Sequence, residues 1–412
     1  MTKAVITGMG VVSPIGNDID TFWAAIKAGK SGLGPITRFD ASGFDSRIAA
    51  EVKDFDPSAY MDKKDARKMA LFTQFAVAAS VQAWRQAGLE GSSVDLERTA
   101  VVLGNGIGGI EIFEQSHAKL LESGPSRMLP LTVPMMIGNE AAGNVAIRFG
   151  IKGPVMTTVT ACASGTDALG QALDMVRSGR ADVVVAGGTE GAISAFAVGA
   201  FCMLKALSTK YNDTPQKASR PFDADRDGFV IGEGAGVVIV ESEAHARARG
   251  ARILVELAGY GASCDAYHIT APEPSGDGGA MAIRLALKDA RIAPEGVAYY
   301  NAHGTSTQMN DPIETAMVKK AFGDHARRMK VSSTKSMTGH MIAAAGAVEA
   351  IVCALAIRDG FFPPTINLDK ADDACDLDYV PNKGVSGTID AAASGSLGFG
   401  GHNACVVLRK YS

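Results

Sequence analysis

Several strand-like runs in this chain are apolar at every position, and they restrict the fold more than any other feature. Residues 183–185 (Val-Val-Val) and 237–240 (Val-Val-Ile-Val) show no polar alternation. A strand with one face in water alternates apolar and polar side chains, whereas a strand covered on both faces is often apolar throughout. These runs therefore predict a sheet with helices on both faces, which is an α/β fold.

Strand-like and helix-like segments alternate along the whole chain, and their order occurs twice. We predict strands at residues 3–7, 99–103, 182–186 and 235–241, and helices at 20–28, 68–87, 164–178 and 243–249. The second series has strands at 253–258, 298–300, 330–332 and 404–408, and helices at 278–290 and 340–357. The strand at 253–258 leads into Gly-Tyr-Gly, as the strand at 3–7 leads into Gly-Met-Gly. We therefore predict two related halves, residues 1–250 and 251–412, which pack as one body because no Pro- or Ser-rich linker separates them.

Length and charge exclude several classes of function. The chain has 412 residues, more than one hydrophobic core usually supports. Its formal net charge of −4 lacks the basic surplus of a nucleic-acid-binding protein, so we expect no nucleic-acid partner. The longest apolar stretch, residues 340–357, contains His340 and Glu349. It predicts a buried helix, so we expect no membrane insertion.

The six cysteines form no C-x-x-C pair, which argues against a structural zinc site and a redox motif. In a chain of this length they are typical of reduced thiols in a cytoplasmic protein. The first residues enter a predicted strand at once, so we expect no signal peptide.

The segment around Cys162 is the strongest candidate for chemistry. A β-branched strand at residues 157–160 runs through a turn of small residues into a predicted helix, so Cys162 lies at a helix N-terminus. The free N–H groups there favour negative charge, so we expect a lowered thiol pKa and a site for an oxyanion. An inert buried thiol has the same local pattern, and this segment alone does not decide between the two.

Two of the seven histidines lie beside glycine at the ends of predicted elements. His303 follows a short strand in residues 301–307, and His340 opens the helix at 340–357. A single histidine in such a place is usually a cap or a core residue. A cysteine together with two such histidines suits nucleophilic acyl transfer.

Four motifs together resemble the β-ketoacyl-acyl-carrier-protein synthases, most closely the type II elongating enzymes of bacterial fatty-acid synthesis. They are residues 159–165 (Val-Thr-Ala-Cys-Ala-Ser-Gly), 301–307 (Asn-Ala-His-Gly-Thr-Ser-Thr), 335–340 (Lys-Ser-Met-Thr-Gly-His) and 398–401 (Gly-Phe-Gly-Gly). The resemblance covers essentially the whole chain. It implies the thiolase fold, with duplicated α/β halves in a layered α-β-α-β-α body of pseudo-twofold symmetry, and a homodimer.

The resemblance also implies roles for individual residues. Cys162 accepts the acyl group, and its N–H forms the oxyanion hole with that of Phe399. His303 and His340 promote decarboxylation of malonyl-acyl carrier protein and stabilise the enolate, while Lys335 supports the histidines and Glu349 anchors the network. No cofactor or metal is implied, because phosphopantetheine arrives on the acyl-carrier-protein substrates and decarboxylation supplies the carbanion.

Further residues are implied to bind the substrates. Thr305 and Thr307 would hydrogen-bond the pantetheine arm, Ile107 and Phe201 would border the acyl chain, and Phe399 would gate the cavity. Because acyl carrier protein is acidic, a basic entrance is expected. Its candidate residues are Lys63, Lys64, Arg67, Lys68, Arg127 and Lys205.

Three positions depart from the family pattern, and several alternatives remain. Gln308 replaces a common Pro, Leu397 an aromatic and Gly395 an Asn, and the last change argues against a structural cation that some members hold beside Asn301 and Glu349. A thiolase or an initiating synthase would carry a second cysteine or an Asn in place of one histidine. A chain-length partner would lack Cys162, whereas a polyketide- or nodulation-type synthase shares the Cys-His-His chemistry. Residues 104–109 fit a dinucleotide fingerprint only weakly.

Overall fold

Ten strands form one continuous sheet in the computed structural model, which describes residues 2–412. Its order is β10-β9-β13-β14-β8-β1-β7-β6-β4-β5. The strands β6 and β7 contain the two apolar runs and are buried at every position, as the sequence predicts. The strands are β1 (Ala4–Val12), β4 (Thr99–Gly104), β5 (Val155–Thr158), β6 (Val183–Glu190), β7 (Gly234–Ser242), β8 (Val255–Cys264), β9 (Tyr299–Asn301), β10 (Lys330–Ser332), β13 (Ala391–Gly398) and β14 (His402–Arg409).

The sheet has the same pairings on both sides of the junction between β1 and β8. From β1 outward, the chain adds β7 and β6 antiparallel and then β4 and β5 parallel. From β8 outward, it adds β14 and β13 antiparallel and then β9 and β10 parallel. Residues 4–6 of β1 pair antiparallel with residues 255–257 of β8 at the centre. This pseudo-twofold order confirms the predicted fold, while the boundary at residue 250 stays a prediction.

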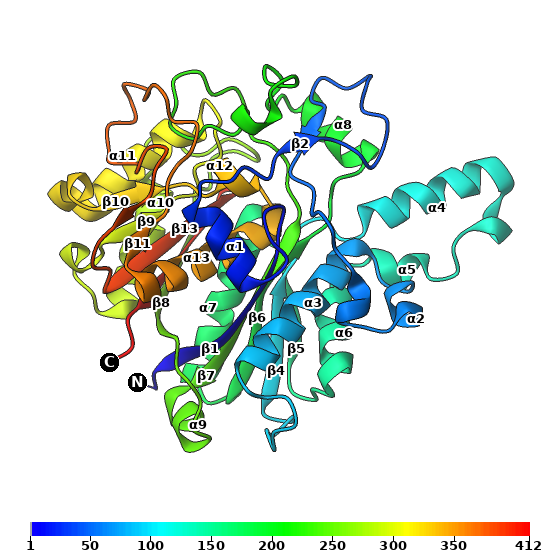
Figure 1. Cartoon of the computed structure of the whole chain (residues 1–412), viewed down its shortest axis with the longest axis horizontal. Coiled ribbons are helices and arrows are strands. Elements are labelled where there is room, and N and C mark those ends of the chain that lie inside the picture. The colour runs from blue at the N-terminus through cyan, green and yellow to red at the C-terminus, as the bar shows by residue number, and fades with distance from the viewer. Residues whose placement is uncertain (1) are drawn as a thin grey trace.

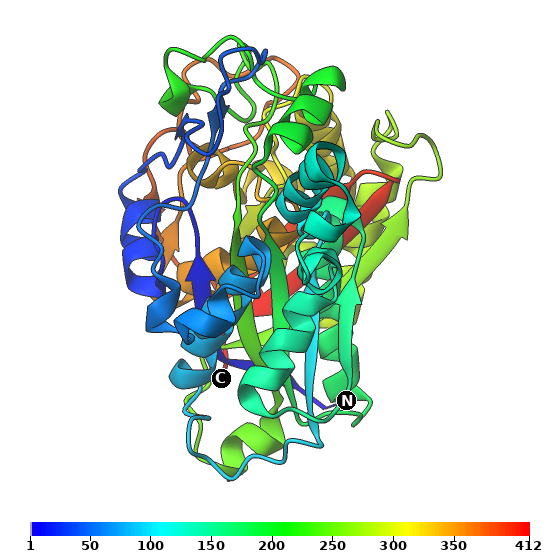
Figure 2. The same cartoon turned by 90° about the vertical axis from the view of Figure 1, so that its right-hand side faces the viewer.

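Helices form the remaining layers, as Figures 1 and 2 show. The helices α7 and α13 contact strands of both halves and form the central layer. The helices α3 and α6 cover one outer face, and α10 covers the other with α11 packed against it. No helix in residues 2–412 is both long and apolar enough to cross a bilayer. These helices are α3 (Leu71–Gln86), α6 (Glu140–Phe149), α7 (Ser164–Arg177), α10 (Asp277–Ala290), α11 (Asn310–Phe322) and α13 (Ala345–Asp359).

Glycines in β1 and β8 let the outer helices lie close to the sheet. A Cβ atom at Gly8 or Gly10 would overlap carbonyl oxygens of α3, and one at Gly259 or Gly261 would overlap carbonyl oxygens of α10. The prediction that the strands end before these glycines is wrong, because β1 continues to Val12 and β8 to Cys264. The two halves thus use the same packing device at equivalent positions.

Two helices project from the body at the right of Figure 1. They are α4 (Ile110–Ser123) and α5 (Thr132–Met136), which pack against each other. Leu121 and Val133 on this arm are 74% and 60% exposed. An apolar surface of this kind is typical of an interface.

Candidate active site

Cys162 lies in a sharp turn between β5 and α7. A short 3-10 turn, Ala161–Ala163, precedes α7, and Ala161 has a left-handed φ of 50°. The hydroxyl of Ser164 donates to the carbonyl of Ala161 at 2.6 Å and accepts the N–H of Thr160 at 2.9 Å. These contacts hold a strained backbone and place the thiol at the start of the helix, as the sequence predicts.

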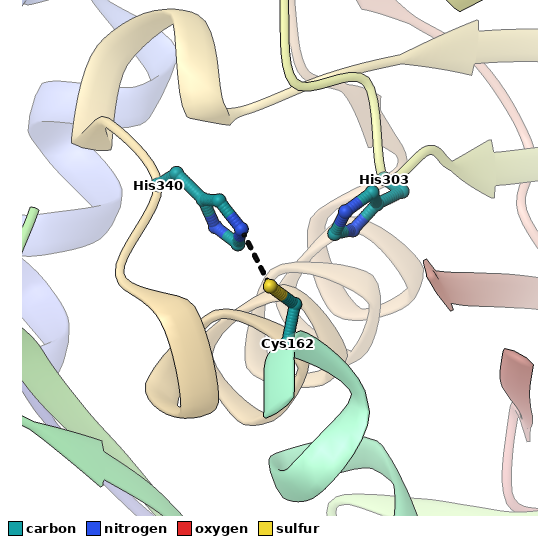
Figure 3. Close-up of side chains that lie close together, drawn as sticks. All are labelled: Cys162, His303 and His340. Atoms are coloured by element: carbon teal, nitrogen blue, oxygen red, sulfur yellow. Dashed lines mark hydrogen bonds between the residues drawn. The ribbon is translucent and has the colours of Figure 1, made fainter. Parts of the chain in front are cut away.

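The two imidazoles predicted from the sequence both lie beside this thiol (Figure 3). The Nε2 atom of His340 is 3.0 Å from the Sγ atom of Cys162. The Sγ atom of Cys162 and one ring nitrogen from each of His303 and His340 all lie within 4.8 Å of one another. The two rings are almost perpendicular, with centroids 5.2 Å apart. A reacting acyl carbon at the sulfur would therefore lie within reach of both rings.

His340 is positioned by an extended segment and not by the start of a helix. Its backbone N–H donates to the carbonyl of Val230 at 2.7 Å, and it forms a bridge with Ile231. The prediction of a helix from residue 340 is wrong: a 3-10 turn covers Ile342–Ala344 and α13 begins at Ala345. A φ of 65° at Gly339 and 47° at Ile342 explains the late start, because an α-helix cannot continue through left-handed residues.

His303 is held by a carboxylate that the sequence analysis missed. Glu314 on α11 accepts the backbone N–H groups of His303 and Gly304, each at 2.7 Å. Burial raises the pKa of Glu314 to about 7. The signal in the sequence was a group of polar residues within one turn of a helix. Asn310, Asp311 and Glu314 lie close together on α11, and the structure buries all three.

The environment of Cys162 favours the neutral thiol. Burial raises its pKa to about 12, and the charge of Lys335 and the N–H groups of Phe399 and Cys162 oppose this increase. The prediction of a lowered pKa is therefore wrong, because the desolvation of the thiolate outweighs the helix N-terminus. Burial and the Lys335 charge keep the pKa of His303 and His340 well below 6.5, so both rings are neutral.

Lys335 and Glu349 form a buried ion pair next to these three groups. Lys335 is 1% exposed and lies on the short helix α12 (Lys335–Thr338), and Glu349 is on α13. Lys335 acts on the histidines and the thiol through its charge, because its ammonium is bonded to Glu349. The implied supporting role of Lys335 and the implied anchoring role of Glu349 stay predictions.

One cavity of about 460 Å³ contains the thiol and both imidazoles. Every residue implied to bind substrate lines it, and Lys205 lines it as well. The backbone of Gly398, which precedes Phe399, packs against the turn that holds Cys162. The implied substrate residues in the wall are Ile107, Phe201, Thr305, Thr307 and Phe399.

The implied basic entrance is not gathered around this cavity within one chain. Of its six candidates only Lys205 is in the wall. The others lie on or beside the short helix α2 (Lys63–Ala66) and in the 3-10 turn Pro125–Arg127. Lys68 forms an exposed ion pair with Asp65. The entrance patch therefore stays a prediction.

Several buried oxygens near the ion pair have no hydrogen-bond partner within residues 2–412. They are Oδ1 of Asn301, Oγ of Ser394 and Oε2 of Glu349. Asn301 and Ser394 are partners on adjacent strands, and α13 packs against β13. Oxygen donors of this kind fit a hard cation. The expectation that no metal is bound stays a prediction.

The departures from the family pattern have local explanations. A Cβ atom at Gly395 would overlap the hydroxyl of Tyr300, so this glycine makes room for a buried tyrosine. Leu397 packs against the core of the second half and also lines the cavity. The carbonyl of Gln308 accepts a hydrogen bond from Arg226 at 3.2 Å. The loop around Gln308 is thus tethered to Arg226.

Glu190 is a second buried carboxylate that the sequence analysis did not identify. At the end of β6 it accepts the N–H of Gly106 at 3.0 Å and that of Ile107 at 3.3 Å. Burial raises its pKa to about 8, and no cation pairs with it among the residues that the structure describes. It fixes the backbone beneath Ile107, at the wall of the cavity.

Comparison with known proteins agrees with this geometry. Residues 1–246 match the family model for the N-terminal domain of β-ketoacyl synthases, and residues 254–369 match that for the C-terminal domain. A 3-oxoacyl-[acyl-carrier-protein] synthase 2 of Coxiella burnetii (strain RSA 493 / Nine Mile phase I) is 50% identical over 408 residues. The match covers 99% of this chain and 98% of that protein.

Two solved structures have the same fold over their whole length. The ishigamide ketosynthase/chain length factor superposes with a TM-score of 0.94 and 38% identity. A type II PKS acyl-carrier protein in complex with its ketosynthase, bound to the hexaketide, gives a TM-score of 0.93 and 37% identity. Each match covers 100% of both chains.

A thiolase fold with one thiol and two neutral imidazoles in a single cavity defines an acyl-transferring condensing enzyme. Within this class, the chain belongs to the β-ketoacyl synthase family.

Proposed function

We propose that the protein is a 3-oxoacyl-[acyl-carrier-protein] synthase that elongates fatty acids by decarboxylative Claisen condensation. One observation carries this proposal: Cys162, His303 and His340 converge within 4.8 Å in the cavity that also contains Thr305 and Thr307. A nucleophile, two polar groups for an enolate and a polar wall for pantetheine are the parts that this reaction requires.

The first half-reaction moves the acyl group from acyl-acyl carrier protein to Cys162. The thiol is protonated, and Nε2 of the neutral His340 accepts its proton as the sulfur attacks the thioester carbon. The N–H groups of Cys162 and Phe399 stabilise the tetrahedral oxyanion. Collapse expels the pantetheine thiolate, which takes the proton from His340.

The second half-reaction uses malonyl-acyl carrier protein. Loss of CO₂ leaves an enolate, and N–H groups of His303 and His340 donate to its oxygen as negative charge develops. Both Nδ1 atoms lack partners within residues 2–412, so neither tautomer is fixed and Nε2 can accept or donate. The enolate carbon attacks the acyl-Cys162 thioester, and the released thiolate takes up a proton from solvent. The product is a 3-oxoacyl chain on the carrier protein.

The choice between fatty-acid and polyketide synthesis rests on the relatives. The synthase of Coxiella burnetii is 50% identical, and the matched chains of the two solved structures are 38% and 37% identical. A polyketide- or nodulation-type synthase is the alternative, because its Cys-His-His chemistry is the same. All six cysteines are free, which suits the cytoplasm as the place of reaction.

A second copy of the chain is the proposed partner of the exposed edge strand β5. This strand ends the sheet, and Val155 and Met156 on it and Val159 just beyond it are exposed. An open apolar edge favours pairing with another strand. The projecting arm of α4 and α5 adds further apolar surface to that side. Acyl carrier proteins remain the proposed donors, and one solved relative is bound to such a protein.

The test is a condensation assay with purified carrier proteins. The enzyme receives malonyl-acyl carrier protein and a series of acyl-acyl carrier proteins of increasing chain length, and the products are separated by mass. A 3-oxoacyl product two carbons longer than the acyl donor is expected with fatty acyl chains. Turnover with only polyketide intermediates would favour the alternative, and no product with any acyl donor would reject the proposal.

A further inference from the structure

The loop that carries the two proposed pantetheine-binding threonines contains a strained residue. Ser306 lies between Thr305 and Thr307 and has a φ of 69°, in the left-handed region that non-glycine residues avoid. The two threonine hydroxyl oxygens are 3.1 Å apart, and that of Thr307 also accepts the N–H of Asn310. Their placement therefore depends on whatever holds this backbone.

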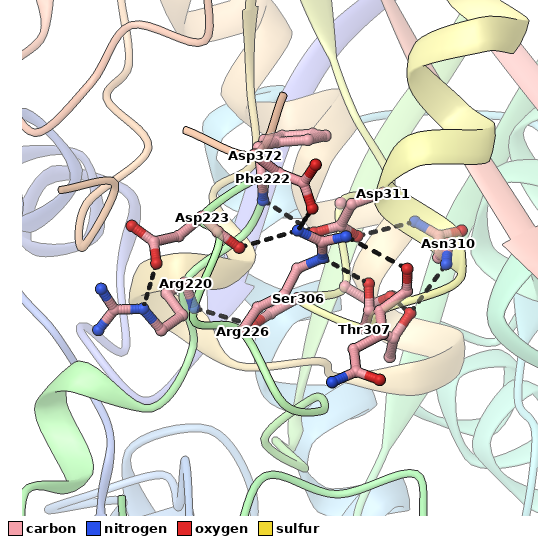
Figure 4. A network of polar contacts seen from close by, with 12 residues as sticks. Arg220, Phe222, Asp223, Arg226, Ser306, Thr307, Asn310, Asp311 and Asp372 are labelled. Carbon is pink, nitrogen blue, oxygen red and sulfur yellow. Dashed lines mark hydrogen bonds and ion pairs between the residues drawn. The ribbon is translucent and has the colours of Figure 1, made fainter. Parts of the chain in front are cut away.

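Arg226 holds the loop through two consecutive carbonyl groups (Figure 4). Its Nε donates to the carbonyl of Thr307 at 2.8 Å, and its Nη2 donates to that of Gln308 at 3.2 Å. Only 4% of its side chain is exposed. The planar guanidinium can meet two carbonyls at fixed angles, which an ammonium cannot do.

The guanidinium is itself fixed from the opposite side. Nη1 donates to the carboxylate of Asp372 at 2.7 Å and to the carbonyl of Asp223 at 2.8 Å. The carboxylate of Asp311 lies 3.7 Å from Nε and accepts the N–H of Phe222. Four of the five N–H groups are thus used, so the arginine has little freedom to move the loop.

We propose that Arg226 is a positioning residue that sets the affinity of the cavity for the pantetheine arm, by fixing the backbone of Thr307 and Gln308. Arg226 is absent from the cavity wall, so it acts through the loop and not on the substrate. This inference rests on the proposed function, since the arm is the expected occupant of the wall formed by Thr305 and Thr307.

The test measures arm binding without catalysis. S-methyl pantetheine, which has the arm but no reactive thiol, is titrated against the rate of alkylation of Cys162 by iodoacetamide. The concentration that halves this rate should rise about tenfold in Arg226→Lys, since one or two hydrogen bonds to the loop are lost. The alkylation rate without ligand should stay within about twofold of the wild-type rate, because iodoacetamide does not use the arm site.

A second variant keeps the test independent of a buried substitution. Asp372 is partly exposed, and Asp372→Asn weakens its contact with Nη1 of Arg226. The S-methyl pantetheine concentration that halves the alkylation rate should rise about threefold in this variant. The matched control is Arg220→Lys. The Arg220 side chain is 7% exposed and bonds to the carboxylate of Asp223. Its hydrogen bond to the loop comes from the backbone N–H, which donates to the hydroxyl of Ser306 and is kept in the variant, so the concentration that halves the alkylation rate should equal the wild-type value.

The outcomes separate the two proposals. If S-methyl pantetheine fails to protect the wild-type protein, the proposed function fails at its binding step. If it protects the wild-type protein and both Arg226→Lys and Asp372→Asn equally well, the role of Arg226 is overturned. An equal loss of protection in Arg220→Lys would also overturn it, because the effect would then be a general loss of packing.

Discussion

The Nε2 atom of His340 lies 3.0 Å from the sulfur of Cys162, whereas His303 makes no hydrogen bond to this sulfur among residues 2–412. The two histidines are therefore not equivalent before substrate binds. Only His340 is placed to accept the thiol proton directly, while both rings lie close enough to the sulfur to reach the enolate of the proposed mechanism.

Substitution of the histidines should separate the two half-reactions. His303→Ala should lower malonyl decarboxylation by about 10²–10³-fold and leave acyl loading nearly unchanged, because one donor to the enolate is lost. His340→Ala should impair both, since the thiol also loses its proton acceptor. Release of ¹⁴CO₂ and mass analysis of the loaded enzyme measure the two steps. A larger loss of loading than of decarboxylation in His303→Ala would contradict the assignment.

The reactivity of Cys162 should increase with pH across the neutral and alkaline range. Burial raises its pKa from 9.0 to about 12, so the thiolate fraction grows about tenfold per pH unit with no plateau near pH 9. The iodoacetamide rate at this residue, followed by peptide mass from pH 6 to 10, measures this. If this rate reached a plateau at or below pH 8, the thiol pKa would instead be lowered, as expected from the helix N-terminus alone.

Removal of one member of the buried ion pair between Lys335 and Glu349 should destabilise the protein. Lys335→Ala leaves a carboxylate without its cation and should lower the free energy of unfolding by about 3–5 kcal/mol. Lys335→Met combined with Glu349→Gln removes both charges and should recover most of this loss. Denaturant unfolding of the three proteins measures the difference. If the double variant were no more stable than the single one, the pair would not be the source of the effect.

Glu190 should make the protein less stable as pH increases. Its pKa is about 8 in the folded protein and near 4.5 when unfolded, so the folded state holds an extra proton between these values. Its contribution is therefore full below pH 4.5 and is lost as pH rises toward 8. The unfolding free energy of the wild-type protein minus that of Glu190→Gln should fall by up to about 1.4 kcal/mol per pH unit between pH 5 and 7. A flat difference would contradict the raised pKa.

The features that depend on local patterns could be predicted from the sequence. The apolar runs in β6 and β7 indicated a covered sheet, and the motifs around Cys162, His303 and His340 led us to expect these three side chains in one site, where the structure places them. Small residues before α7 also marked the sharp turn. These features depend on neighbours in the chain, which any single sequence displays.

Other features depend on groups that are distant in the sequence. Cys162 and His340 are separated by 178 positions, and the pKa of the thiol follows from how the assembled cavity excludes water. Gly8 and Gly10 resemble a turn until α3 is packed against them. Glu314 resembles an ordinary helix residue until it meets the N–H of His303. The thiol pKa, the packing at Gly8 and Gly10 and the role of Glu314 all depend on tertiary contacts.

Covalent capture of the acyl group tests the central claim most directly. The enzyme is incubated with a fatty acyl-acyl carrier protein and no malonyl donor, digested with trypsin, and the acyl mass is located on its peptides. The acyl mass is expected on the Cys162 peptide and not on that of the exposed Cys264. An unmodified Cys162 peptide, with the wild-type protein folded and the acyl donor intact, would contradict it.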